Sequence, residues 1–230
     1  MPDRHSSRVD SRLHSSKAVH PEEMRIQRSF PMKVGFIGAA NIAQTYSKHL
    51  LRSGHSVVLS NRSGPETLTD LVAALGARAS AASVEVAAKA DVVVLALPWT
   101  QLRSLQQRDI DWSGRIVIDA TNALLTYAPD FRRADLGGRT SSEIVADMLP
   151  GARIVKALNT LYFKVLERDP SEAGGRRVMF LSGDDSEAKK TVSSILSSTG
   201  FCPIDLGGLA EGGRIQQFGA PLAGPNLLAL

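Results

Sequence analysis

Apolar residues recur along positions 33–206 in two alternating patterns, short continuous runs and runs at helical spacing. The continuous runs predict buried strands over residues 33–38, 56–60, 78–80, 91–98, 115–120, 153–158, 177–182 and 203–206. After the first of them, Ala43, Tyr46 and Leu50 fall on one face of a predicted helix. Strands that alternate with helices predict a mainly parallel, doubly wound α/β sheet of the Rossmann type, because helices then cover both faces. We expect the carboxyl ends of all its strands to share one edge, where ligands bind.

Polar and glycine-rich stretches indicate where the remaining elements begin and end. Residues 63–66 predict a capping box ahead of a helix, and Asp184 with Glu187 predicts the start of the last helix. The buried stripe of the helix after the capping box is predicted to be Leu68, Leu71, Val72 and Leu75. Other helices are predicted near residues 84–88, 100–107 and 141–149. Residues 124–139 show little periodicity, so we expect an irregular insertion there.

The chain divides into three parts. Residues 1–31 have no periodicity and few apolar side chains, so we expect a disordered N-terminal extension. Residues 32–206 hold the alternating pattern and predict one nucleotide-binding Rossmann domain. Residues 207–230 form a glycine-rich C-terminal extension, which we expect to pack on the domain or on a partner subunit.

Composition narrows the functional class. The formal charge is +4 for 230 residues, too small an excess to indicate a nucleic-acid surface. The single cysteine, Cys202, excludes an intrachain disulfide and a cysteine-based metal site, and no other metal site is expected. No apolar run reaches the roughly 18 residues that a membrane span needs, and no secretory signal is evident, so we expect a cytoplasmic protein.

The turn after the first strand predicts a site for a pyrophosphate. A helix N-terminus presents backbone N–H groups and a favourable dipole to negative charge, provided that side chains do not block the approach. The usual fingerprint is G-x-G-x-x-G, and the corresponding residues here are Gly38, Ala40 and Ala43. Ala40 occupies the position nearest the pyrophosphate, so its methyl group could weaken binding.

The end of the second strand predicts which dinucleotide binds. NAD-binding proteins usually place an acid there for the ribose 2′-hydroxyl, but no acid occurs between Lys33 and Pro65. The chain offers a polar cluster instead, composed of Ser60, Asn61, Arg62 and Ser63. A guanidinium and hydroxyl groups suit a 2′-phosphate, so we expect NADP(H) rather than NAD(H). The alternative is that Arg62 is only a solvated charge and Ser63 only a helix cap.

Six segments resemble a known family in their order along the chain. They are GFIGAANIAQ, GHSVVLSNRSGPETL, ADVVVLALPW, VIDATNAL, GARIVKALNTL and IDLGGLAEGGRIQQFGAPLAG. These segments are similar to the NADP-dependent oxidoreductases related to F420-coenzyme:NADP oxidoreductase, whose Rossmann domain resembles the N-terminal domain of pyrroline-5-carboxylate reductase. The resemblance extends from Met32 to about Leu227, and its most discriminating parts are the SNR cluster and the C-terminal segment.

The resemblance implies a set of cofactor-binding residues and a reaction. By position, Gly38, Ala39, Ala40, Asn41 and Ile42 would hold the pyrophosphate, and Ser60, Asn61, Arg62 and Ser63 the 2′-phosphate. Ala96, Leu97 and Pro98 would line the path from adenosine to nicotinamide, and Thr121 and Asn122 would border the nicotinamide. In that family hydride passes directly between the nicotinamide and a flat acceptor.

The sequence identifies no catalytic residue and leaves the substrate open. Trp99, Lys156 and Asn159 are candidates for the substrate pocket, with core packing for Trp99 and a structural ion pair for Lys156 as the alternatives. His49 and His55 are expected to be solvated. Hydride transfer between stacked rings needs position more than an acid or a base.

Three functions remain compatible with the sequence. Pyrroline-5-carboxylate reductases and hydroxyacid dehydrogenases of this type carry a large C-terminal helical domain, which we do not expect in this protein. This expectation favours an acceptor of the flavin or deazaflavin (F420) type, or a pocket completed by a second subunit. The alternatives are a reductase of a small carbonyl or imine and a non-catalytic NADP(H)-sensing domain. A homodimer is expected, with residues 221–230 covering a neighbour.

Overall fold

The computed structural model describes residues 31–230. The predicted disordered extension, residues 1–31, therefore lies outside the described residues except for Pro31. Between residues 31 and 230 no helix is both long and apolar enough to cross a membrane.

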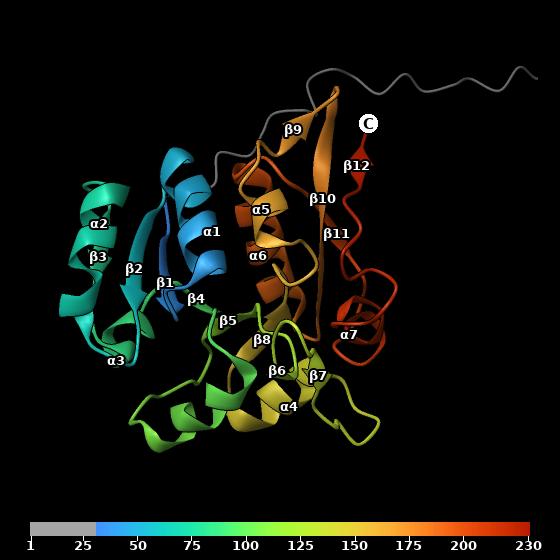
Figure 1. Ribbon diagram of the computed structural model, residues 1–230, viewed down its shortest axis with the longest axis horizontal. Coiled ribbons are helices and arrows are strands. Elements are labelled where there is room, and N and C mark those ends of the chain that lie inside the picture. The colour runs from blue at the N-terminus through green and yellow to red at the C-terminus, as the bar shows by residue number, and fades with distance from the viewer. Residues whose placement is uncertain (1–30) are drawn as a thin grey trace, which may run out of the picture.

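Six parallel strands form the centre of the molecule (Figure 1). They are β1 (Lys33–Ile37), β2 (Ser56–Ser60), β3 (Ala79–Ala81), β4 (Val92–Leu95), β5 (Ile116–Asp119) and β8 (Arg153–Lys156). Their order across the sheet is β3-β2-β1-β4-β5-β8, so the chain moves outward from β1 in both directions. This order leaves a crevice where the loops after β1 and β4 diverge, which is where doubly wound sheets bind ligands. The predicted doubly wound, mainly parallel α/β fold is confirmed.

The far side of the sheet departs from the prediction. β10 (Gly175–Gly183) runs antiparallel to β8, and β11 (Cys202–Asp205) runs parallel to β10. The expectation that all carboxyl ends share one edge is therefore wrong for these two strands. The reason is the connection from β8, which forms the short helix α5 (Phe163–Leu166) and a hairpin of β9 (Ser171–Glu172) with β10. Without a full crossover helix the chain re-enters the sheet in the opposite direction.

Helices cover both faces of the sheet, as Figure 1 shows. One face carries α1 (Asn41–Arg52), α2 (Thr69–Leu75), α5 and α6 (Ser186–Ser198), and the other carries α3 (Val84–Ala87), the 3-10 helix η3 (Trp99–Gln107) and α4 (Ser141–Met148). Neighbouring residues of β4 show why both faces are apolar. Val92 and Val94 pack into the first core, which lies under α1, α2, α5 and α6. Val93 and Leu95 pack into the second core, which lies under α3, η3 and α4. Successive strand side chains point to opposite faces, so a continuously apolar strand contributes to both cores.

Two predicted helix starts are wrong in detail. Gly64 precedes the 3-10 helix η2 (Pro65–Leu68) and has no side-chain cap, so residues 63–66 form no capping box. The Ser63 N–H donates to Asn61 Oδ1 instead, because the short asparagine side chain can close a turn with its own backbone. The cap of α6 is Asp185, whose carboxylate accepts from the Ala188 N–H at 2.7 Å, and not Asp184. Of the predicted stripe, Leu68 is buried but belongs to η2, whereas Leu71, Val72 and Leu75 of α2 are only half-buried.

Two segments expected to be irregular contain regular structure. Residues 124–139 include an antiparallel pair, β6 (Leu124–Thr126) and β7 (Arg132–Arg133), because the chain reverses between them. The C-terminal extension includes α7 (Glu211–Gln216) and β12 (Leu228–Ala229). β12 pairs antiparallel with β10, with Leu228 opposite Arg177, so this part of the extension lies on the same chain's sheet.

The two imidazoles of the α1 region are buried, which contradicts the expectation that they are solvated. His49 Nε2 lies 2.7 Å from the carbonyl oxygen of Leu166, and His55 Nδ1 accepts from the Met32 N–H at 3.1 Å. The other ring nitrogen of His55 lies 2.9 Å from Ser198 Oγ. Burial lowers the pKa of both imidazoles and so favours the neutral rings, and His55 must be neutral for its Nδ1 to accept from the Met32 N–H. These residues therefore connect α1 and the turn after it to α5, β1 and α6.

Candidate functional site

The turn after β1 is shaped by a glycine that no other residue could replace without strain. Gly38 has φ +104°, and a Cβ at this position would lie 2.1 Å from the carbonyl oxygen of Ala96. Two backbone hydrogen bonds hold the crossing, from Gly38 N–H to the Ser60 carbonyl at 2.9 Å and from Ala96 N–H to the Ile37 carbonyl at 2.8 Å. The ends of β1, β2 and β4 are thereby held together around one small residue.

The N-terminus of α1 opens beside this turn. Its N-cap residue is Ala40, which provides no side-chain cap, and no acid occurs in the first turn. The N–H groups that a capping side chain would satisfy are left to another acceptor, and the helix dipole favours a negative one. Ala39 and Ala40 line the cleft described below, whereas Asn41 is exposed and Ile42 is half-buried against the first core.

The loop after β2 is held by one amide side chain. Asn61 Oδ1 accepts from the Ser63 N–H at 2.9 Å, and Asn61 Nδ2 donates to Thr67 Oγ1 at 2.9 Å. The hydroxyl of Ser60 is fully buried and donates to the Phe36 carbonyl at 2.7 Å, so it supports the strand end instead of facing the cleft. Arg62 is exposed and has neither an ion pair nor a side-chain hydrogen bond within residues 31–230. Its charge is therefore available to a ligand.

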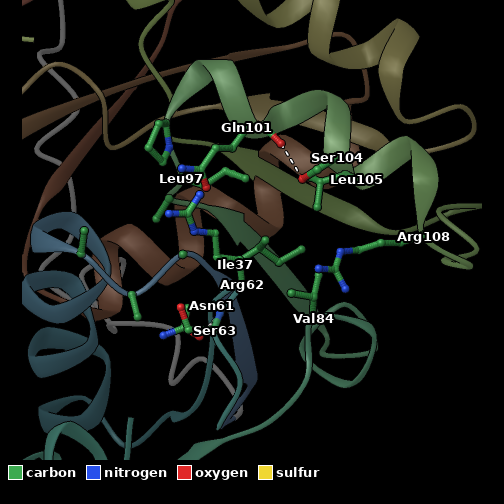
Figure 2. A pocket seen from close by; sticks show the side chains of 15 residues that line it. Ile37, Asn61, Arg62, Ser63, Val84, Leu97, Gln101, Ser104, Leu105 and Arg108 are labelled. Carbon is green, nitrogen blue, oxygen red and sulfur yellow. Dashed lines mark hydrogen bonds between the residues drawn. The ribbon is translucent and has the colours of Figure 1, made fainter. Parts of the chain in front are cut away.

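These segments surround a cleft of about 220 Å³ at the carboxyl edge of the sheet, shown in Figure 2. Its lining comes from the ends of β1, β2 and β4, the start of α3 and one side of η3. The lining residues are Ile37, Gly38, Ala39, Ala40, Asn61, Arg62, Ser63, Val84, Ala96, Leu97, Pro98, Gln101, Ser104, Leu105 and Arg108. The only ionisable side chains among them are the guanidiniums of Arg62 and Arg108. The cleft is therefore apolar along part of its walls and positively charged.

A second cluster lies at the ends of β5 and β8 and is completely enclosed. Asp119 and Lys156 have no exposed side-chain surface, and Lys156 Nζ lies 3.1 Å from Asp119 Oδ2. Thr121 donates to Asp119 Oδ1 from its N–H at 2.9 Å and its hydroxyl at 2.6 Å, and Ser142 donates to Oδ2. Burial favours the neutral carboxyl, but Lys156, Ser142 and Thr121 outweigh it and hold the pKa of Asp119 below its usual range.

An amide network continues from this cluster toward α7. Asn159 Nδ2 donates to the Gln216 carbonyl at 2.8 Å and lies 3.4 Å from Asn122 Oδ1. Gln216 Nε2 donates in turn to the Lys156 carbonyl and to Asn159 Oδ1, both at 3.2 Å. Leu158, which follows β8 and lies between Lys156 and Asn159, has φ +65°, a backbone conformation that L-residues seldom adopt. The C-terminal segment is therefore joined by hydrogen bonds to the end of β8 and to the loop after it, whose backbone is strained at Leu158.

The structure separates the expected site residues into these two groups. It brings together Gly38, Ala39, Ala40, Asn61, Arg62, Ser63, Ala96, Leu97 and Pro98 in the cleft. It places Thr121, Asn122, Lys156 and Asn159 in the second cluster, outside the cleft lining. Trp99 begins η3 and packs, half-buried, against the second core, the alternative considered for it. Lys156 forms a buried ion pair with Asp119, which is the structural alternative stated for it.

The sequence did not predict several residues that belong to these two groups. In the cleft they are Ile37, Val84, Gln101, Ser104, Leu105 and Arg108, and in the second cluster Asp119, Ser142 and Gln216. Asp119 had a usable signal, since it is an acid at the end of a buried apolar strand. Gln216 had none, because only the folded chain brings it to Asn159.

Among the described residues, no group of three His, Cys, Asp or Glu side chains could hold a metal ion. A dinucleotide, by contrast, fits features of the cleft. Its phosphates match the uncapped α1 N-terminus and Arg62, and its adenosine half matches the apolar walls.

Comparisons with known proteins support this assignment. Residues 33–123, which include every residue lining the cleft, match the family model described as NADP oxidoreductase coenzyme F420-dependent. Among solved structures, the hypothetical protein SMa0349 from Sinorhizobium meliloti is 41% identical, with a TM-score of 0.81. The match covers 89% of this chain and 98% of that one.

Two further relatives are more distant. A protein provisionally named an F420-dependent NADP-reductase from Arthrobacter sp. FB24 is 25% identical, with a TM-score of 0.66. That match covers 77% of this chain and 86% of that one. The metalloreductase STEAP3 of Rattus norvegicus is 29% identical over 206 residues, which are 86% of this chain and 39% of the relative. The chain thus spans about two-fifths of the length of this curated relative.

Proposed function

We propose that this chain, which belongs to the family described as NADP oxidoreductase coenzyme F420-dependent, is an oxidoreductase that transfers hydride between NADP(H) in the cleft and a flavin-like or deazaflavin acceptor. The observation that carries it is Arg62, a guanidinium with no ion-pair partner among residues 31–230, which lies beside Ser63 after β2 in the same cleft as the uncapped α1 N-terminus.

Arg62 is the residue proposed to select NADP(H). A guanidinium donates paired hydrogen bonds to a phosphate, and no acid in the cleft lining would repel the extra charge of the 2′-phosphate. Ser63 can add its hydroxyl, and Asn61 holds the Ser63 backbone in place. The pyrophosphate would then lie over residues 38–40 at the start of α1, where backbone N–H groups and the helix dipole favour it.

The chemistry of the cleft supports a flat hydride acceptor. Among its described lining residues there is no histidine, carboxylate or lysine that could supply a proton, and direct hydride transfer between rings does not need one. A carbonyl or imine reductase would need a proton donor, so that alternative is less well supported.

Exposed aromatic side chains also support an acceptor of this shape. Phe131 stacks on Phe218 with ring centroids 5.8 Å apart, and both Phe131 and Tyr127 are about half exposed. Phe131 and Tyr127 extend from the β6–β7 hairpin, which begins at Leu124, five residues after the end of β5. Aromatic faces bind flat rings by stacking, and Arg132 and Arg133 beside them could pair with the negative groups of a flavin or deazaflavin.

The metalloreductase relatives suggest a second candidate acceptor. Their name indicates a metal ion as substrate, and this chain covers less than half of their length. A hydride carries two electrons and a ferric ion accepts one, so a flavin between the two would be required. A ferric chelate therefore belongs among the acceptors to be tested.

The cofactor assignment is tested with Arg62→Ala. Dissociation constants for NADPH and NADH, measured by fluorescence titration, should show a preference of the wild-type chain for NADPH that falls at least tenfold in the variant. Arg103→Ala, an exposed arginine on η3 outside the cleft, is the matched control and should leave both constants unchanged. An unaltered preference in Arg62→Ala contradicts the assignment.

The acceptor is tested by following NADPH oxidation with deazaflavin F420, FMN, FAD, a cyclic imine, small carbonyls, and a ferric chelate with and without flavin. Turnover with a flavin or deazaflavin supports the proposal, and turnover with the imine or a carbonyl alone contradicts it. Binding of NADPH without turnover of any acceptor indicates the sensing domain. Phe131→Ala should raise the KM for the flat acceptor several-fold without changing NADPH affinity.

The homodimer stays a prediction. Leu227 and Leu230 of the C-terminal extension are exposed on this chain and could be covered by a second copy. An equilibrium sedimentation mass equal to one chain would contradict it.

A further inference from the structure

The cleft contains a second arginine whose surroundings differ from those of Arg62. Arg108 directly follows η3, and its Nη1 lies 2.5 Å from Glu85 Oε1. Both side chains are about one-third exposed, and Glu85 itself does not line the cleft. The pKa of Glu85 lies below its usual range, because its carboxylate accepts hydrogen bonds from its own backbone N–H, from Arg108 and from Ser83. The carboxylate is therefore charged. In the view of Figure 2, the guanidiniums of Arg62 and Arg108 lie on opposite sides of Ile37.

The walls between the two arginines are apolar. Ile37 and Val84 contribute from β1 and α3, and Leu97 and Leu105 from the loop after β4 and from η3. Three of these side chains belong to the second core and are almost fully buried, which fixes their positions. A rigid, apolar slot of this kind matches the flat heterocycle of a nucleotide better than its sugar or phosphates.

The two arginines are suited to different parts of a dinucleotide. Arg62 has no anionic partner in the described chain, so its full charge can meet a phosphate. The charge of Arg108 is largely offset by Glu85 at 2.5 Å, and the same carboxylate would repel a phosphate placed there. A guanidinium held in this way still presents N–H donors and a flat face, which suit the ring nitrogens and π-face of a neutral base.

We propose that Arg108, positioned by Glu85, binds the adenine base at the end of the cleft formed with Val84 and Leu105. Arg108 thereby contributes to affinity for both dinucleotides, whereas Arg62 selects between them. The proposal rests on the assignment of this cleft to NADP(H) and adds the residue that recognises the base.

The test compares three ligands in the full chain: NADPH, NADH and reduced nicotinamide mononucleotide, which lacks the adenosine half. Arg108→Ala should weaken NADPH and NADH by about the same factor, roughly five- to tenfold, and leave the mononucleotide unchanged. Glu85→Gln, which keeps the size and loses the charge, should weaken the two dinucleotides together by a smaller factor. Arg103→Ala again serves as the matched control.

Two results overturn the inference. One is unchanged NADPH affinity in Arg108→Ala, and the other is a loss confined to NADPH, which would place Arg108 at the 2′-phosphate. If Arg108→Ala does not fold, as judged by its unfolding midpoint, Arg108→Gln retains the stem and is read in the same way.

Failure of the proposed function gives a different pattern. If the wild-type chain does not prefer NADPH, the cofactor assignment fails whatever Arg108 does. If the wild-type preference depends on Arg62 while Arg108→Ala binds normally, only the inference about the base fails.

Discussion

The cleft and the Asp119 cluster each contain a long cationic side chain, which is exposed in the cleft and fully buried in the cluster. Lys156 is fully buried, and its ammonium contacts the Asp119 carboxylate and the Thr121 carbonyl, both at 3.1 Å. Arg62 extends from the loop after β2 without a partner in the described chain. Both regions lie at the carboxyl ends of parallel strands, so their place in the fold does not explain the difference.

The difference is one of desolvation. Burying a charge costs several kcal/mol of folding free energy unless other groups pair with it. The Lys156 ammonium must therefore keep its buried partners for the protein to stay folded. An exposed charge costs little free energy to leave unpaired, so the Arg62 guanidinium is available to bind an anion. Within one sheet edge, therefore, the enclosed polar residues hold the strand ends together, and the open ones are left for the ligand.

The largest effect should follow from breaking the buried pair. Lys156→Met leaves Asp119 charged and unpaired in the interior, so the free energy of unfolding should fall by about 3–5 kcal/mol in urea denaturation. Lys190→Met is the matched control, since Lys190 and Glu187 form a solvent-exposed pair on α6 and its removal should not shift the midpoint. Equal midpoints for the two variants would remove the distinction between the regions.

A smaller loss is expected at the turn between β1 and α1. Gly38→Ala adds strain at φ +104° and a contact with the Ala96 carbonyl, so it should destabilise the fold by about 2–4 kcal/mol and abolish NADPH binding. Gly76→Ala is the control, because Gly76 has φ +93° with open space around it and incurs only the backbone strain, about 1–3 kcal/mol. If both variants lose the same stability, the close approach of β1 and β4 loops is not what requires glycine.

A charge placed in the cleft should change binding without changing the fold. Asn61→Asp keeps the size of the side chain and the acceptor for the Ser63 N–H, but adds a negative charge beside Arg62. NADPH affinity should fall about tenfold, with NADH affinity unchanged, since only the 2′-phosphate is repelled. The two dissociation constants and the urea midpoint provide the check. An equal loss for both dinucleotides would mean that the loop, and not a phosphate contact, was disturbed.

The smallest effect concerns pH. His49 and His55 have lowered pKa values in the fold, so below about pH 6.5 the unfolded chain takes up protons that the folded chain does not. Their contribution to stability is complete above pH 6.5 and is lost as the pH falls below it. The urea midpoint should therefore be lower at pH 5.5 than at pH 7.5, and the difference should shrink in His55→Gln. Asp119 acts in a lower window, since its depressed pKa makes its contribution disappear only below about pH 4.

Much of the cleft could be predicted because its residues follow strands directly. Gly38, residues 61–63 and residues 96–98 each lie within three residues of the end of an apolar run, and parallel strands bring such ends together. Arg108 lies thirteen residues after β4, at the far end of η3, and nothing in its local pattern distinguishes it from Arg103. Only the fold shows that one arginine faces the cleft and the other faces solvent.

The order of strands and helices, the parallel centre of the sheet and the polar end of β2 follow from local patterns, because apolar periodicity reports burial one element at a time. The direction of β10, the burial of His49 and His55, and the contact of Gln216 with Asn159 across 57 residues do not. These features depend on which surfaces meet once the elements pack, and on whether a polar group that is buried there finds a partner. The tertiary structure alone therefore decided that Lys156 is buried in an ion pair and that Arg62 lies exposed at the cleft.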